Sequence, residues 1–208
     1  MTLLAQACAK VNLTLEALGK RDDGYHDIVS VLQSISLADT ISFESGETLE
    51  YTCDVPDLQT SDNLILRAAH SLREATGCGK GAKIHLIKRI PVAAGLGSGA
   101  TDAATTLIAL DRLWGTNVPF PRLLELAAGL GSDVSFFLHG GTALAEGRGE
   151  AVTPLLSVPE MWLVLLIPPI EIADKTAQLY AQLRDDIFTS GHKTSKLVEN
   201  INKGTRPD

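Results

Sequence analysis

The chain has 208 residues, of which 45% are hydrophobic and 21% charged, so it has the composition of a folded globular protein that buries a sizeable core. Its 18 basic and 25 acidic residues give a net charge of −7. This charge argues against a nucleic-acid partner, because no large positive field is available to neutralise phosphates.

The N-terminal segment predicts a half-buried strand, because residues 5–17 alternate between apolar and polar side chains. Lys10 and Asn12 share the polar face and should lie about 7 Å apart along the strand. Lys10 also comes too early for the apolar core of a signal peptide. With only three cysteines and no C-x-x-C spacing, we expect a cytoplasmic protein without disulfides or structural zinc.

The following segments mix strands and helices. In the first half of the chain, the patterns predict a turn-rich loop over 19–28, a strand over 29–45 with a turn at Ala38–Asp39, a helix that begins at Ser61–Asp62 and ends at Gly77, and a strand over 82–90. In the second half, they predict helices over 101–115 and 119–131, two strands around a turn at 147–149, a strand over 162–169 and a helix over 174–183. Because strands and helices do not alternate regularly, an α+β fold is favoured over a doubly wound parallel sheet.

Two features of the last third of the chain concern its organisation. The longest apolar run, 161–170, is too short to span a bilayer, so we expect no membrane partner and interpret the run as a buried strand. A change of pattern near Pro154–Pro159 predicts a boundary between a domain over 1–156 and a second part over 157–208, which is small for an independent domain.

Residues 91–102, "PVAAGLGSGATD", place glycines at alternate positions directly before a predicted helix. A helix N-terminus exposes unpaired amides and the positive end of the dipole, and glycine lets an anion approach the backbone. The stretch therefore predicts a phosphate-binding loop, with a tight strand-to-helix turn as the alternative. It lacks the Gly-Lys-Ser/Thr end of a Walker loop, and a helix follows where a dinucleotide-binding unit requires a strand.

This loop, together with "AKVNLTL" at 9–15, resembles two motifs of the GHMP kinases, which hold ATP phosphates on such a loop. Three further stretches resemble the bacterial 4-diphosphocytidyl-2-C-methyl-D-erythritol kinases of the non-mevalonate isoprenoid pathway, namely 19–28, 131–150 and 168–180. The resemblance implies the two-domain GHMP kinase fold, with an N-terminal domain of mixed sheet and helices. It also implies an ATP- and Mg²⁺-dependent kinase that phosphorylates a hydroxyl of that small cytidine compound.

The resemblance assigns the catalytic roles to two residues. Asp133 is the carboxylate that orients or deprotonates the substrate hydroxyl, and Lys10 is the cation beside it. Without the family, Asp133 would be a helix N-cap and Lys10 a solvated strand residue.

ATP binding is assigned to the loop and to two residues near it. By resemblance, the residues are Asn63, Lys88, Pro91, Gly95, Leu96, Gly97, Ser98, Gly99 and Thr101. The Thr101 hydroxyl can also meet Mg²⁺ through the phosphates, whereas N-capping is its alternative role. Lys88 and Arg89 are alternatively the solvated end of a strand. Ala100 stands where the common family loop has a serine, so it receives no role.

Substrate choice is assigned to "DGYH". By resemblance, Tyr25 stacks on the cytosine, His26 hydrogen-bonds the base edge and Asn12 helps to hold the substrate. Without the resemblance, the stretch would be read as an ordinary turn with a packed ring. "IPPIEIADK" offers no aromatic residue as a second ring against the cytosine.

The chain departs from the family at its C-terminal end, because the third motif, of Gly-Ser/Thr-Gly type, does not occur. We therefore expect the C-terminal domain over 157–208 to be incomplete. Two alternatives to the cytidine-specific kinase remain: a GHMP kinase of the homoserine or mevalonate type, which has no use for a base-stacking tyrosine, and a nucleotide-binding module without turnover.

Overall fold

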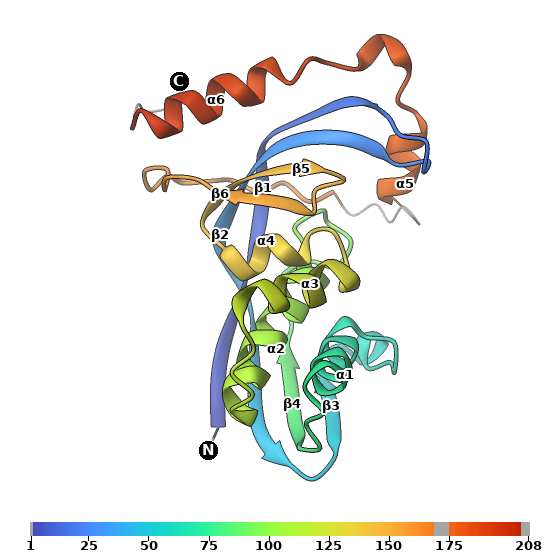
Figure 1. Ribbon diagram of the computed structural model, residues 1–208, viewed down its shortest axis with the longest axis vertical. Helices are drawn as coiled ribbons and strands as arrows, with labels where there is room; N and C mark the ends of the chain where they lie inside the picture. Colours follow the sequence, from blue (N-terminus) through green and yellow to red (C-terminus); the bar gives the residue numbers. More distant parts are fainter. Residues whose placement is uncertain (1, 169–174, 205–208) are drawn as a thin grey trace.

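One mixed sheet forms the frame of the computed structural model, which describes residues 2–168 and 175–204. The six strands are β1 (Thr2–Lys20), β2 (His26–Gly46), β3 (Leu49–Cys53), β4 (Gly81–Ile87), β5 (Thr142–Gly147) and β6 (Ala151–Pro154). β1 and β2 form a long antiparallel hairpin (Figure 1). β3 is parallel to β4, whereas β6 is antiparallel to β5. The predicted α+β class is confirmed.

The second edge of β2 is divided between two strands. β5 pairs with residues 28–33 of β2, and β4 pairs with residues 40–46. Residues 34–39 therefore have no ladder partner on this edge, and on the other edge β1 pairs with Ser34, Ala38 and Asp39. We call residues 34–39 the β2 gap. It separates the β5–β6 end of the sheet from the β3–β4 end (Figure 1).

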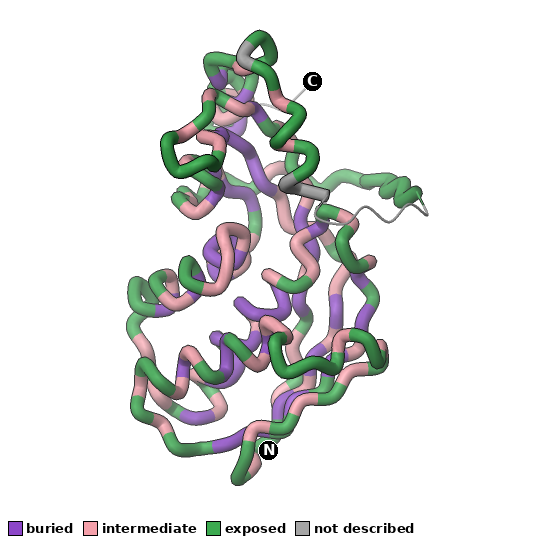
Figure 2. Tube along the Cα trace, turned by 90° about the vertical axis from the view of Figure 1, so that its right-hand side faces the viewer, coloured by how far each residue is buried: buried purple, intermediate pink, exposed green. Residues whose placement is uncertain are grey.

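Helices cover the sheet and complete the core. The helices are α1 (Leu64–Thr76), α2 (Ser98–Trp114), α3 (Phe120–Leu130), α4 (Val134–His139), α5 (Lys175–Ala181) and α6 (His192–Asn202), with short 3-10 turns at Pro56–Leu58 and Asp185–Ile187. Ile41 and Phe43 of β2 lie on one face, as the period of a strand requires, and pack with residues of α1 and α2 in the main core. Figure 2 shows buried residues concentrated along the strands and on the helices packed against them.

β1 does not keep the uniform alternation predicted for residues 5–17. Its register along β2 shifts just before Lys10 and again just after Asn12. A shift of one residue exchanges the two faces of a strand. Glu16 is consequently buried, whereas Leu15 is 53% exposed. The apolar/polar pattern carries no signal for such a bulge.

The turn predicted at Ala38–Asp39 is wrong, because β2 continues through both residues. The Asp39 side chain is completely buried and accepts hydrogen bonds from the backbone amides of Arg89 (2.5 Å) and Ile90 (2.8 Å). This aspartate is therefore used for a tertiary contact and not for a local turn.

The strand predicted over 162–169 is also wrong, as far as the structure describes it. Residues 162–168 form no regular element and are all exposed, Trp162 completely. A strand needs a neighbour for its backbone hydrogen bonds, and no strand of the described residues pairs with this segment. Residue 169 lies outside the described residues, as does residue 174 of the helix predicted over 174–183, whose described part forms α5.

The predicted helix ends are more accurate than the predicted starts. Gly77 and Gly115 end α1 and α2 in the left-handed conformation, with φ of 65° and 68°. Asn63, and not Ser61–Asp62, caps α1, because its Oδ1 accepts the amide two residues later at 2.9 Å. α2 begins at Ser98, earlier than predicted, so the glycine-rich stretch runs directly into the helix.

The last described helix returns to the first hairpin. The Thr194 amide donates to the Glu16 carboxylate at 2.7 Å, and the Thr189 amide donates to the carbonyl of Ala17 at 2.9 Å. Burial alone would raise the pKa of Glu16, but the hydrogen bonds from Thr194 and its neighbours lower it. α6 is therefore attached to β1 from beyond the boundary predicted near 154–159. No helix in the described ranges is long and apolar enough to cross a membrane.

Candidate functional site

The glycine-rich loop, residues 91–97, is attached to the bulged part of β1. The Lys10 amide donates to the Leu96 carbonyl at 3.0 Å, and Leu96 packs with Ala9 and Ile90 in a small buried cluster. The loop leaves β4 and leads into α2, so this attachment brings the N-terminus of α2 beside Lys10.

α2 begins without a side-chain cap. Gly97 is the N-cap residue, and its carbonyl accepts the Thr101 amide at 2.9 Å. The amides of residues 98–100 precede the first intrahelical hydrogen bond and lie at the positive end of the helix dipole. An uncapped helix end of this kind suits a phosphate or another anion.

Gly97 is where the backbone approaches its neighbours most closely. Its φ is 74°, and a Cβ built on it would lie 2.5 Å from the Phe137 ring and 3.2 Å from Cγ of Lys10. Gly95 has a similar φ of 81°, but nothing lies within 4 Å of its Cβ position. Glycine is therefore required at 97 by both conformation and space, and at 95 by conformation alone.

Lys10 and Asp133 meet beside this helix end. Lys10 is 7% exposed, and its Nζ lies 3.6 Å from Oδ2 of Asp133. Asp133 is the N-cap residue of α4, but its side chain makes no capping hydrogen bond, and 42% of it is exposed. The alternative roles therefore do not describe these residues: Lys10 is not a solvated strand residue, and the Asp133 carboxylate does not cap its helix.

A chain of hydrogen bonds orients Lys10. Its Nζ donates to Oδ1 of Asn12 at 2.9 Å, and Nδ2 of Asn12 donates to Oγ of Ser30 at 2.7 Å. The Ser30 hydroxyl in turn donates to the carbonyl of Thr14 at 2.6 Å. Ser30 was not identified from the sequence, although a serine within the apolar run "IVSVL" is a signal for such a buried contact.

Tyr25 and His26 lie at the tip of the β1–β2 hairpin and face different neighbours. Tyr25 is 56% exposed, and the guanidinium carbon of Arg148, from the β5–β6 turn, lies 4.8 Å from its ring centroid. The His26 ring lies 5.2 Å from the ring of Tyr180 and 5.8 Å from that of Phe188.

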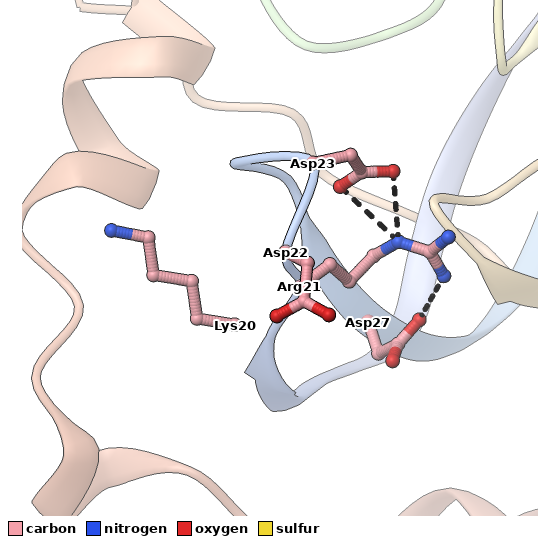
Figure 3. A pocket seen from close by; sticks show the side chains of 5 residues that line it. All are labelled: Lys20, Arg21, Asp22, Asp23 and Asp27. Carbon is pink, nitrogen blue, oxygen red and sulfur yellow. Dashed lines mark hydrogen bonds and ion pairs between the residues drawn. The ribbon is translucent and has the colours of Figure 1, made fainter.

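The hairpin tip is held by a charged cluster. An open hollow of about 390 Å³ is lined by Lys20, Arg21, Asp22, Asp23 and Asp27. Figure 3 shows the Arg21 guanidinium between the carboxylates of Asp23 and Asp27, at 3.2 and 2.6 Å, with Lys20 directed away. Asp23 also accepts the Tyr25 amide at 3.1 Å, so the cluster fixes the backbone that carries Tyr25.

Tyr180 and Phe188 were not singled out from the sequence. The stretch "IPPIEIADK", which lacks aromatic residues, lies partly outside the described residues, and the nearest rings come from later positions. Burial raises the pKa of the Tyr180 phenol, and the negative charge of Asp133 raises it further. Tyr180 is therefore within electrostatic range of Asp133 as well as in contact with His26.

Two residues predicted to bind ATP already have protein partners. Asn63 caps α1 with its oxygen, and its Nδ2 donates to the Tyr51 hydroxyl at 3.1 Å and to the Leu58 carbonyl at 2.9 Å. Lys88 is 9% exposed, which excludes the alternative of a solvated strand end. Its Nζ is bound by the carboxylates of Asp39 and Asp102.

The remaining predicted ATP residues lie on the loop and the first turn of α2. Leu96 is 8% and Thr101 2% exposed, so these two side chains point into the protein, whereas Gly95 and Gly99 are exposed. Pro91 and Ser98 are partly exposed. Gly95 and Gly99 therefore offer backbone to a ligand, beside the exposed side chain of Val92.

Comparisons with known proteins identify the family of the chain. Residues 63–141 match the GHMP kinases N terminal domain. The chain is 49% identical over 205 residues to the 4-diphosphocytidyl-2-C-methyl-D-erythritol kinase of Dehalococcoides mccartyi, with 98% of this chain and 72% of the relative covered. It is 45% identical over 207 residues to that of Caldanaerobacter subterraneus subsp. tengcongensis, with 98% and 70% covered.

Solved structures give the same result. The crystal structure of a 4-(cytidine 5'-diphospho)-2C-methyl-D-erythritol kinase superposes with a TM-score of 0.80 at 34% identity, covering 99% of this chain and 73% of that one. The phosphomevalonate kinase of Streptococcus pneumoniae superposes with a TM-score of 0.69 at 13% identity, covering 98% and 74%, which shows a shared fold alone.

The uncapped glycine-rich helix end, the sheet topology and these matches define a GHMP kinase. Within that class, the chain belongs to the family of the 4-diphosphocytidyl-2-C-methyl-D-erythritol kinases, and ATP is the phosphate donor of its class.

Replacing Gly97 by alanine should destabilise the protein more than the same change at Gly95. Both changes force a side chain into a left-handed conformation, at a cost of about 1–2 kcal/mol. Only Gly97→Ala also places a Cβ 2.5 Å from the Phe137 ring, which should add roughly 1–3 kcal/mol. Urea unfolding of the two variants measures the difference, and equal losses would show that Phe137 does not constrain the loop.

Proposed function

We propose that the chain transfers the terminal phosphoryl group of ATP to a hydroxyl of 4-diphosphocytidyl-2-C-methyl-D-erythritol, in the non-mevalonate pathway of isoprenoid synthesis. The observation that carries the proposal is the position of Lys10, whose Cγ would lie 3.2 Å from a Cβ built on Gly97, the N-cap of α2, while its Nζ lies 3.6 Å from Oδ2 of Asp133. A cation between an anion-binding helix end and a carboxylate is the arrangement that phosphoryl transfer to an alcohol requires.

The triphosphate binds to the backbone of the glycine-rich loop and to the first amides of α2. Gly95, Gly97, Ser98 and Gly99 supply backbone that a phosphate can approach, and α2 has no side-chain cap to compete. Pro91 sets the entry of the loop, and Leu96 anchors it through the hydrogen bond from Lys10. Asn63 takes part only by capping α1, since all its polar atoms have partners.

Asp133 receives the hydroxyl of the substrate. Its carboxylate is partly exposed and free of any capping hydrogen bond, so an oxygen remains available to accept the hydroxyl proton. Lys10 stabilises the negative charge on this carboxylate and on the phosphoryl group in transit. Asn12 and Ser30 hold Lys10 in this position.

Magnesium fits the site as a companion of ATP and not as an ion held by the protein alone. Among the described residues, no group of three or more His, Cys, Asp or Glu side chains is placed to hold a metal. Mg²⁺ supplies charge neutralisation on the phosphate oxygens when bound. Thr101 is the hydroxyl that the resemblance assigns to this ion, but its side chain is 2% exposed and points into the protein, so it does not face the phosphates.

The cytidine end of the substrate binds at the hairpin tip. Tyr25 offers an exposed ring for stacking, with Arg148 at the ring face, and His26 offers its ring nitrogens to the base edge. We assign the second aromatic ring of this site to Tyr180. Its ring lies beside that of His26, and the negative charge of Asp133 contributes to the raised pKa of its phenol. The base and the reacting hydroxyl then lie at two ends of one site.

The organisation of the protein follows from the same proposal. We retain as a prediction the division into a domain over 1–156 and a second part over 157–208. The three cysteines are free thiols, which suits the reducing cytoplasm, and the small-molecule substrate and ATP are the only partners that the function needs.

The first test is Mg²⁺- and ATP-dependent release of ADP by the 208-residue chain, with and without 4-diphosphocytidyl-2-C-methyl-D-erythritol. We expect release only with the cytidine compound, and competition by cytidine diphosphate. Release with homoserine or mevalonate instead would identify another GHMP kinase. ADP binding without any release would identify a nucleotide-binding module.

Asp133→Asn should lower the rate of transfer by roughly 10²–10⁴, the usual range for a lost general base, because the amide cannot accept the proton. ATP affinity should change little, since Asp133 lies beside the helix end and not on it. Single-turnover kinetics and calorimetric ATP binding measure the two effects. Glu125→Gln, which removes an exposed ion pair with Arg122, is the control, and full activity of Asp133→Asn would remove Asp133 from the mechanism.

Tyr25→Ala should weaken the cytidine substrate by about 1–3 kcal/mol, the value of a lost base stack, without changing ATP affinity. Tyr25→Phe keeps the ring and should bind the substrate normally. Michaelis constants for both substrates provide the comparison. If the alanine and phenylalanine variants bind the cytidine compound equally well, the ring does not stack on the base.

A further inference from the structure

Three charged side chains are buried directly behind the glycine-rich loop. Asp39 comes from the β2 gap and is 0% exposed, Lys88 follows the end of β4 and is 9% exposed, and Asp102 lies in the first turns of α2 and is 4% exposed. Nζ of Lys88 donates to Oδ2 of Asp39 and, at 2.8 Å, to Oδ2 of Asp102. We call these residues the Asp39–Lys88–Asp102 cluster.

The cluster holds the loop at its entry. Oδ1 of Asp39 accepts the amides of Arg89 (2.5 Å) and Ile90 (2.8 Å), so one carboxylate binds a side chain and two consecutive backbone groups. The Lys88 amide is bound separately, by Oδ1 of Asp54 at 2.8 Å. The backbone from 88 to 90 is thus fixed immediately before the loop begins at Pro91.

The same cluster holds the far side of the loop. The ion pair between Lys88 and Asp102 connects the entry of the loop to the fifth residue of α2. Because α2 is rigid over its first turns, the position of Asp102 determines where the amides of residues 98–100 point. One lysine therefore spans the loop and sets the distance between its two ends.

Stability does not explain the cluster well. Two carboxylates share one cation, and Oδ1 of Asp102 is the one buried side-chain nitrogen or oxygen atom without a hydrogen-bond partner among the described residues. Buried ion pairs often stabilise a protein no better than apolar residues of the same volume. Holding the backbone on the two sides of the loop therefore explains the cluster better than a gain in stability does.

We propose that Asp39, Lys88 and Asp102 are positioning residues for nucleotide binding, which hold the glycine-rich loop and the first amides of α2 in the arrangement that accepts the ATP phosphates. The choice of ATP as ligand rests on the proposed function. This role differs from direct contact between Lys88 and ATP, because the Lys88 ammonium is engaged by two carboxylates.

The test compares Asp102→Asn and Asp102→Ala with the wild type in the full chain. Both variants leave Lys88 and Asp39 as a one-to-one ion pair, and the amide of Asp102→Asn retains the shape and one acceptor, so folding should persist. Asp111→Asn is the control, because Asp111 lies on the same helix but binds the Thr116 hydroxyl (2.6 Å) and the Val118 amide (2.9 Å) at its opposite end.

ADP affinity by calorimetry should fall about threefold in Asp102→Asn and about tenfold in Asp102→Ala, with a parallel rise in KM for ATP. KM for the cytidine compound should stay within about twofold, as should the ADP affinity of Asp111→Asn. Hydrogen exchange of the peptide that covers residues 98–102 should become faster in the Asp102 variants and not in the control.

Three outcomes would overturn the proposal. ADP affinity that is unchanged or tighter in both Asp102 variants would show that the ion pair between Lys88 and Asp102 does not position the loop. It would favour direct binding of the nucleotide by Lys88. An equal loss of affinity for ADP and for the cytidine compound, together with a lower Tm, would show that the substitution destabilises the whole fold. If the wild type binds no ADP, both proposals are refuted. If it binds ADP without turnover, the kinase function is refuted, but the ADP affinities of the variants still test the positioning role.

Discussion

The β2 gap is the constraint on which the rest of the site depends. A strand whose edge is paired along its whole length offers no room for a loop, whereas β2 leaves residues 34–39 between its partners β5 and β4 without a ladder. The chain that leaves β4 turns into this space, where Asp39 binds the backbone of Arg89 and Ile90. That contact fixes the backbone immediately before the glycine-rich loop, so interrupted pairing in the sheet leaves the place where we propose that the nucleotide binds.

The irregular register between β1 and β2 lies on the other side of the loop. Lys10 lies between two of these register shifts, where its amide binds Leu96 and its ammonium faces Asp133. Lys10 is tolerated in this buried place because Asn12 and Asp133 supply oxygen atoms to its Nζ. Two irregularities of one hairpin therefore assemble the anion-binding and carboxylate parts of the site.

The cytidine end is assembled from segments that are distant in the sequence. Tyr25 and His26 lie at the hairpin tip, which Arg21 braces through Asp23 and Asp27. Arg148 reaches the Tyr25 ring from the β5–β6 turn, and Tyr180 reaches His26 from α5. The contacts of this proposed cytidine end therefore come from three segments that are distant in the sequence.

The sequence by itself determined the family, the α+β class, the glycine-rich loop, the helix ends at Gly77 and Gly115 and the proximity of Lys10 to Asn12, because each of these depends on local patterns or on ordered motifs. Tertiary structure alone decided which face of β1 Lys10 occupies, that Asp39 lies in a continuous strand, that Lys88 is bound by two carboxylates and that Tyr180 contacts His26. The apolar run at 162–168 shows the same limit, since it forms no strand without a neighbour among the described residues. The physical reason is that a bulge, a buried ion pair or a strand partner is settled by residues far away in the chain, whereas a periodic pattern reports only what its own neighbours can do.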